Sequence, residues 1–135
     1  LKYFIIDDCG IPVNPKTVYG QIHGSLMHGI GGSIYEQLVY DESGQLLSST
    51  FMDYLIPTSI DGCPKELVID HIETPSRGLG GFKGMGEGAT IGAPASLMNA
   101  VDDALYLLGV KVTETPLSPE NILKSIKKAT IKPNN

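Results

Sequence analysis

The sequence lacks an excess of basic residues. Its 135 residues include 10 Lys and Arg against 15 Asp and Glu, which gives a formal net charge of −5 at pH 7. Non-specific binding to nucleic acid or to anionic lipid requires a basic face, so we expect neither partner. Hydrophobic residues make up 41% of the chain and charged residues 19%, a balance that argues against intrinsic disorder.

Long hydrophobic runs are also missing, and we expect no signal peptide. No apolar run approaches the roughly 20 residues of a transmembrane helix, so we expect no membrane span. The only cysteines, Cys9 and Cys63, lack the spacing of metal ligands. We interpret them as free thiols in a reducing compartment, which predicts a cytoplasmic protein, although a single disulfide between them stays open.

Several familiar catalytic motifs do not occur. The chain has no Gly-Lys-Ser/Thr of a Walker A loop, no H-E-x-x-H and no G-x-S-x-G. His23 and His28 are five residues apart rather than the four of a helical zinc pair, so we assign no metal ligands. Residues 84–89 formally satisfy the dinucleotide pattern G-x-G-x-x-A, but no apolar strand leads into them.

Glycine, by contrast, is abundant. The chain has 16 glycines, and 12 of them fall within residues 20–32 and 78–92, whereas average usage is about 7%. Large apolar residues are interleaved with them, so these windows are not flexible linkers. Clustered glycine among apolar residues indicates backbone that packs closely against another element or a ligand.

The hydrophobic pattern predicts an α+β fold, with a mixed sheet and two or three packed helices in a single domain over residues 1–135. Because the chain begins with Leu1 and continues directly into an apparent strand, we expect it to be a piece of a longer protein or a processed product. We predict strands at 2–6 and 67–72, a loop at 11–18, a hairpin around the turn at 41–44, an interrupted strand at 46–56, and helices at 20–39, 94–108 and from 118 onward.

Individual residues support these helices. Apolar residues every four positions from Ile22 to Leu38 form one helical stripe. Pro94 suits a first turn and Gly109 the position after a helix C-terminus. Ser118, Pro119 and Glu120 form an N-cap, a first-position proline and an acidic first turn.

Glu87 and Gln21 are the candidate site residues. Glu87 stands among glycines. A partly dry pocket there would raise the pKa of its carboxyl and make it a general base. The alternative is a salt bridge within the loop. Lys83 could oppose that shift or orient the loop. Gln21, expected at a helix start, is either an ordinary polar residue or a ligand contact beside free N–H groups.

Four segments together resemble the C-terminal part of the molybdenum-binding large subunit of the xanthine dehydrogenase family. This family includes aldehyde oxidoreductases and the aerobic carbon monoxide dehydrogenases. The order and spacing of the segments match over roughly residues 3–129. The segments are G-Q-x-x-G at 20–24, D-Y-x-x-P at 53–57, G-x-K-G-x-G-E at 81–87, and a helix that includes 99–104.

The resemblance implies a role for several residues. Glu87 matches the family glutamate that acts as a base beside a molybdenum held by a pterin cofactor, and Gln21 matches the glutamine that hydrogen-bonds this molybdopterin. Gly84 and Gly86 belong to the same cofactor-binding segment. His28 and Ser25 depart from common family residues, so neither is assigned a role.

The resemblance also implies an enzyme larger than this chain. It would hydroxylate an aldehyde, an N-heterocycle or carbon monoxide with water as oxygen donor. Its partners would be the remainder of the large subunit, an Fe–S subunit and an FAD subunit, and the isolated chain would be inactive and bind no cofactor. The alternatives are a non-catalytic scaffold or interaction domain of the same origin and a stand-alone dinucleotide-binding module.

Overall fold

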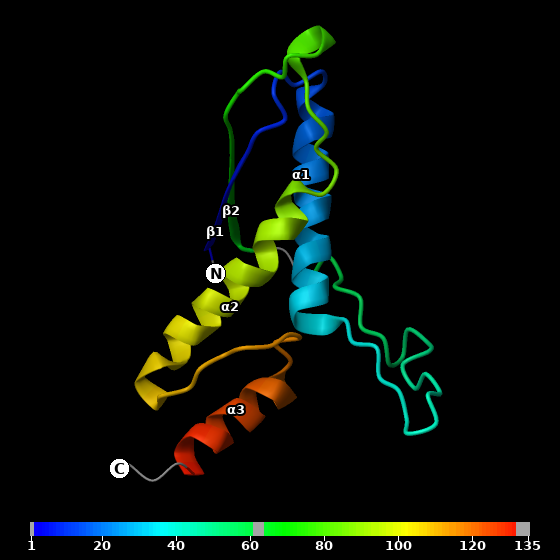
Figure 1. Cartoon of the computed structure of the whole chain (residues 1–135), viewed down its shortest axis with the longest axis vertical. Coiled ribbons are helices and arrows are strands. Elements are labelled where there is room, and N and C mark those ends of the chain that lie inside the picture. Colours follow the sequence, from blue (N-terminus) through cyan, green and yellow to red (C-terminus); the bar gives the residue numbers. More distant parts are fainter. Residues whose placement is uncertain (1, 61–63, 132–135) are drawn as a thin grey trace.

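Two strands and three α-helices make up the computed structural model, which describes residues 2–60 and 64–131 (Figure 1). The strands β1 (Lys2–Asp7) and β2 (Glu66–His71) form a two-stranded parallel sheet. The α+β class and both predicted strands are confirmed. The expected mixed sheet is wrong for the described residues, because β1 and β2 run parallel.

The two faces of the sheet differ. Inward-facing Tyr3, Ile5, Leu67 and Ile69 pack against the core. The opposite face is apolar but open: Phe4, Ile6 and Val68 are 64%, 65% and 42% exposed. Parallel sheets in globular proteins are normally covered on both faces, so this outer face is unusual for a free-standing fold.

The helix α1 (Pro15–Ile30) begins before the predicted residue 20. Asn14 caps it, since its side chain accepts a hydrogen bond from the Thr17 amide, and Pro15 takes the first helical position. The predicted loop at 11–18 is therefore wrong from Pro15 onward. The predicted apolar stripe is confirmed within the helix, where Ile22, Leu26 and Ile30 are buried in the core.

A π-helical turn, Gly31–Tyr35, ends this first helical segment earlier than the predicted residue 39. The amide of Glu36 closes that turn on the Gly31 carbonyl at 2.9 Å, and the backbone of Glu36 is extended. Leu38, the last residue of the predicted stripe, consequently lies outside the helix and is 58% exposed.

The helix α2 (Gly88–Leu105) packs across α1 (Figure 1). A β-carbon added at Gly29 would lie 2.5 Å from Cβ of Ala93, so this glycine permits the close approach. The Thr90 hydroxyl also donates to the Ser25 carbonyl at 2.7 Å. The prediction that Pro94 starts this helix is wrong: packing of small residues against α1 supports the turns that precede the proline.

The C-terminal elements follow the sequence signals more closely. A 3-10 turn, Tyr106–Leu108, extends α2 and ends at Gly109, whose φ of 65° is left-handed. Helix α3 (Pro119–Ile131) begins as predicted, with the Ser118 hydroxyl accepting from the Asn121 amide at 3.2 Å. No helix in the described part of the chain is long and apolar enough to cross a membrane.

The segment between α1 and β2 contains a turn rather than a second long strand. The predicted hairpin is present as a single antiparallel bridge between Tyr40 and Leu46. The predicted strand at 46–56 is wrong. Its chain folds back at Thr50, whose carbonyl accepts from the amides of Asp53 and Tyr54. Beyond the bridge at Leu46, residues 46–56 pair with no strand in the described ranges.

Candidate functional site

The end of β1 and the second glycine window lie against each other at one end of α1 (Figure 1). The Lys83 amide donates to the Cys9 carbonyl at 2.7 Å, and the Ile11 amide donates to the Gly81 carbonyl at 3.2 Å. An antiparallel bridge joins Gly10 to Phe82 between these bonds. The glycine-rich loop is thus fixed through its backbone to the turn that follows β1.

Asp8 is the centre of the side-chain contacts in this region. Its carboxylate accepts from the Gly10 amide at 2.8 Å, the Thr74 amide at 3.2 Å and Lys83 Nζ at 2.8 Å, and also from the Thr74 hydroxyl. The Lys83 ammonium, with Thr74 and the Gly10 amide, holds the pKa of the Asp8 carboxyl well below its usual range. Lys83 therefore orients the loop through Asp8.

A cleft of about 460 Å³ opens between this loop and α1. Gln21 of the first glycine window and Gly86 of the second both contribute to its wall. The two windows therefore meet in space, as close packing of their backbones requires. The lining residues are Cys9, Ile11, Val13, Asn14, Thr17, Val18, Gln21, Phe82, Lys83, Met85 and Gly86.

Gln21 does not stand at a helix start. Because α1 begins at Pro15, Gln21 lies in the second turn, where its backbone N–H faces an intrahelical carbonyl. The expectation that free N–H groups at Gln21 attract an anion is therefore wrong. Its side chain is exposed and borders the cleft, so the amide is available to donate and accept there.

Glu87 is the N-cap residue of α2, directly after Gly86. Its carbonyl accepts from the Thr90 amide at 3.0 Å, and its side chain is exposed and makes no capping hydrogen bond. The carboxylate takes part in none of the ion pairs found among residues 2–60 and 64–131. The alternative of a salt bridge within the loop is therefore wrong, and Lys83 pairs with Asp8 instead.

The glycines of the loop fall into two groups. A β-carbon at Gly88 would lie 2.6 Å from Oδ2 of Asp7, so the chain's own packing requires glycine there. At Gly84 and Gly86 an added β-carbon would meet nothing within 4 Å, and neither residue has a positive φ. Nothing within the described chain explains those two glycines, and of the two Gly86 lines the cleft.

Cys9 and the histidines do not form a metal site. Cys9 is a free thiol, 2% exposed, and burial raises its pKa. Nε2 of His71 lies 3.1 Å from the Gly10 carbonyl and 3.8 Å from the Cys9 sulfur. His23 and His28 are exposed on α1. In the described ranges no three His, Cys, Asp or Glu side chains cluster as metal ligands; Cys63 lies outside those ranges.

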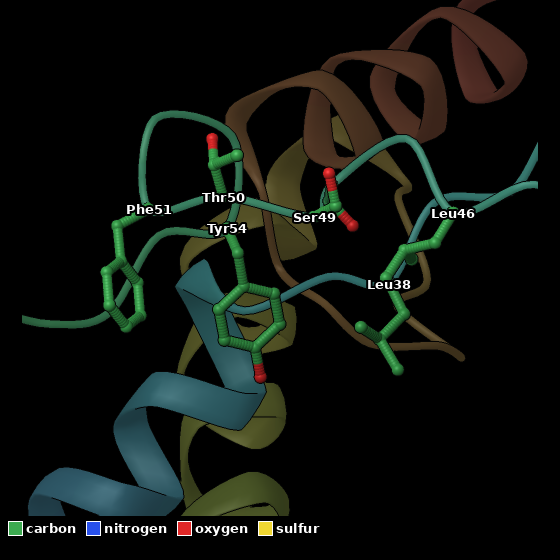
Figure 2. A pocket seen from close by; sticks show the side chains of 7 residues that line it. Leu38, Leu46, Ser49, Thr50, Phe51 and Tyr54 are labelled. Atoms are coloured by element: carbon green, nitrogen blue, oxygen red, sulfur yellow. The ribbon is translucent and has the colours of Figure 1, made fainter.

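A second hollow, of about 280 Å³, lies beyond the other end of α1 (Figure 2). Tyr54 donates its hydroxyl to Glu36 at 2.6 Å, and this hydrogen bond raises the pKa of Tyr54. A β-carbon added at Gly31 would meet both Glu36 and Pro57. The sequence segments around 35–36 and 53–57 thus pack on each other. The hollow is lined by Leu38, Leu46, Ser48, Ser49, Thr50, Phe51 and Tyr54.

The dinucleotide-binding alternative does not agree with the fold. In a Rossmann unit the glycine pattern joins the end of a strand directly to a helix. Here β2 ends at His71, and a long loop with a 3-10 turn, Leu79–Gly81, separates it from Gly84. The formal pattern at residues 84–89 is therefore not a strand-to-helix phosphate loop.

The chain resembles known proteins over most of its length. A family described as "Molybdopterin cofactor-binding domain" matches residues 1–62. The nicotine 6-hydroxylase large subunit of Paenarthrobacter nicotinovorans is 45% identical over 127 residues, 93% of this chain. The solved structure of quinoline 2-oxidoreductase from Pseudomonas putida 86 superposes over 94% of the chain with a TM-score of 0.88 and 46% identity.

A second solved structure, the Cu,Mo-CO dehydrogenase in its carbon monoxide reduced state, covers 96% of the chain with a TM-score of 0.87 and 30% identity. All three relatives are much longer than this chain. The chain spans 15% of the nicotine 6-hydroxylase large subunit and 16% of each of the two crystallised chains.

Proposed function

We propose that this chain, which belongs to the molybdenum-binding large-subunit family of xanthine dehydrogenase and carbon monoxide dehydrogenase, forms one wall of a molybdopterin site and supplies its catalytic base. The base is Glu87, and the cofactor contacts are Gln21, Gly84 and Gly86. The supporting observation is that Gln21 and Gly86, the residue directly before Glu87, line the same cleft.

The residues present fit the cofactor. The Gln21 amide can both donate to and accept from the polar edge of a pterin. Gly86 lines the cleft, and both it and Gly84 leave open space where a side chain would stand. The backbone can therefore approach a bulky group closely. When bound, the molybdenum-pterin group supplies the redox chemistry and activates water.

In this proposal Glu87 takes up a proton. For an N-heterocycle or an aldehyde, hydroxylation converts a substrate C–H and one water into C–OH, two protons and two electrons. Carbon monoxide and one water would instead give carbon dioxide, two protons and two electrons. The Glu87 carboxylate accepts one proton at an oxygen atom as the water oxygen is transferred. Such a base must come within hydrogen-bond reach of that proton and contributes typically 10²–10⁴-fold to the rate.

The substrate class that we propose is an N-heterocycle, an aldehyde or carbon monoxide, since relatives in this family act on nicotine, quinoline and carbon monoxide according to their names. The remaining part of the large subunit would cover the exposed Glu87 and the open apolar face of β1 and β2. Electrons would pass to Fe–S and FAD subunits. The free Cys9 thiol is compatible with a reducing, cytoplasmic setting.

The test is Glu87→Gln in the complete large subunit, assembled with its partners. We expect turnover per bound molybdenum to fall by about 10²–10⁴-fold, while molybdenum and pterin contents stay at the wild-type level. Glu114→Gln, an exposed glutamate in the segment before α3, is the matched control and should retain full turnover.

Near-normal turnover per molybdenum in Glu87→Gln would contradict the assignment of the base. A complete wild-type subunit that carries no molybdenum and shows no turnover would instead favour the alternative of a non-catalytic scaffold. Metal content must therefore be measured alongside the rate in every variant.

A further inference from the structure

We infer that Asp7, the last residue of β1, and Asp8, which follows it, are positioning residues for Glu87, because Asp8 binds the glycine-rich loop before Glu87 and Asp7 packs against the residue after it. This inference rests on the proposed role of Glu87. Neither aspartate lines the cleft, so each would act through the loop and not by touching the cofactor.

Asp8 holds the loop on the side that precedes Glu87. Its Oδ2 atom binds Lys83 Nζ at 2.8 Å, while Oδ1 accepts from the backbone amides of Gly10 and Thr74. The Asp8 and Lys83 side chains are only 23% and 36% exposed. One carboxylate thereby links the turn after β1, the segment after β2 and the loop that carries Glu87.

Asp7 packs against Gly88, the residue that follows Glu87. Its carboxylate oxygens lie 2.6 and 3.3 Å from where a β-carbon on Gly88 would stand. Asp7 is itself fixed, since Oδ1 accepts from the Asp8 amide at 2.7 Å and its carbonyl accepts from the Ile72 amide at 3.0 Å. The first residue of α2 therefore packs directly on the end of β1.

The short segment between these two contacts explains why both are needed. It contains Gly84 and Gly86, which restrict the backbone least of all residues, and Met85, which packs on the core. Ordering each such residue costs backbone conformational entropy. A misplacement of about 1 Å in a catalytic group can cost on the order of 10²-fold in rate.

Lys83→Met and Asp8→Asn in the complete, cofactor-loaded enzyme test the contact between Lys83 and Asp8, which precedes Glu87 in the loop. Turnover per bound molybdenum should fall by at least about 10-fold, with KM changed much less than kcat and with an altered pH profile of kcat. The turnover of the double variant should be no lower than that of the less active single variant, because the two residues act as one unit.

The matched control is Asp102→Asn. Asp102 also pairs with a lysine, Lys111, and accepts from a backbone amide, that of Val112 at 2.7 Å, with a side chain 22% exposed. It lies in α2 far along the chain from Glu87. Loss of the Asp102 carboxylate should leave turnover per molybdenum unchanged, and its largest effect should be a lower melting temperature.

Gly88→Ala tests the contact between Gly88 and Asp7, which follows Glu87 in the chain. This variant remains informative if Asp8→Asn does not fold. It should likewise lower kcat per molybdenum. Unchanged kcat and pH profile in Lys83→Met and Gly88→Ala, with only stability or molybdenum content reduced, would overturn the positioning role. Because Glu87→Gln is measured in parallel, an active Glu87→Gln enzyme would instead identify the proposed base as the error.

Discussion

Nζ of Lys83 lies 2.8 Å from Oδ2 of Asp8, a residue 75 positions earlier in the chain. This ion pair joins the end of β1 to the loop that leads to Glu87. The sequence marks both residues as charged and Lys83 as part of a glycine-rich segment, but it does not show that they are partners. The pair leads to a prediction about acid stability.

Asp8→Asn should lower the free energy of unfolding at neutral pH and have little effect in acid. The pKa of Asp8 is lowered in the folded state, chiefly by Lys83. As the pH falls, the unfolded state therefore binds more protons than the folded state does. The stabilisation is complete above the ordinary carboxylate pKa and is lost as the pH falls through the lower, folded value. Denaturant unfolding of both proteins from neutral to acidic pH measures it.

A gap between wild type and Asp8→Asn that stays constant down to acidic pH would contradict this prediction. Asp103→Asn serves as its control. Asp103 is exposed on α2 and makes no ion pair within the described residues, so its removal should leave the curve of stability against pH nearly unchanged.

Gly29→Ala should destabilise the packing of α1 on α2. The new β-carbon would lie 2.5 Å from Cβ of Ala93 and 3.1 Å from the Thr90 carbonyl oxygen, so the helices must separate. Overpacking of this kind costs about 1–3 kcal/mol. Gly92→Ala, which meets nothing within 4 Å, should be neutral or stabilising by up to about 1 kcal/mol. Equal melting temperatures for the two variants would disprove the contact.

Gly86→Ala should separate folding from cofactor binding. The added methyl group meets nothing in the described chain, so the melting temperature of the cofactor-free subunit should match the wild type. Molybdenum and pterin contents should fall, because the methyl group occupies space at the cleft wall. Gly92→Ala again provides a control that should retain its cofactor, and full cofactor content in Gly86→Ala would argue against close approach at this residue.

Tyr54→Phe should destabilise the segment that follows the π-helical turn. The hydrogen bond to Glu36 raises the pKa of Tyr54, so its contribution is present below the ordinary phenol pKa and is lost as the pH rises through the folded value. Ultraviolet titration of tyrosinate should show one phenol ionising late in the wild type and not in Glu36→Gln. Tyr106→Phe, which changes a side chain 76% exposed, should leave stability unaltered.

Short-range signals allowed much of the fold to be predicted. A short apolar run before a turn identified β1. The four-residue spacing of Ile22, Leu26 and Ile30 identified the buried face of α1, and Ser118 with Pro119 identified the start of α3. These signals depend on neighbours within a few residues, so they can be read along the chain. The cap formed by Asn14 and Pro15 was also readable and could have shown the true start of α1.

Long-range contacts decided what the local pattern could not. Residues 46–56 carry a strand-like composition, yet neither of the two strands in the described part of the chain pairs with them, and the chain turns at Thr50. Pro94 looks like a helix start, yet α2 begins at Gly88 because Asp7 and α1 support the earlier turns. Propensity is a weak preference that such tertiary contacts override.

The sequence by itself determined the α+β class, the resemblance to a molybdenum-binding large subunit, and the candidates Gln21, Gly84, Gly86 and Glu87. Only the tertiary structure decided that the two glycine windows meet in one cleft, and that Asp8 is the partner of Lys83. The physical reason is that spacing along the chain encodes local backbone geometry, whereas contacts between residues far apart in the chain exist only after the helices and strands have packed.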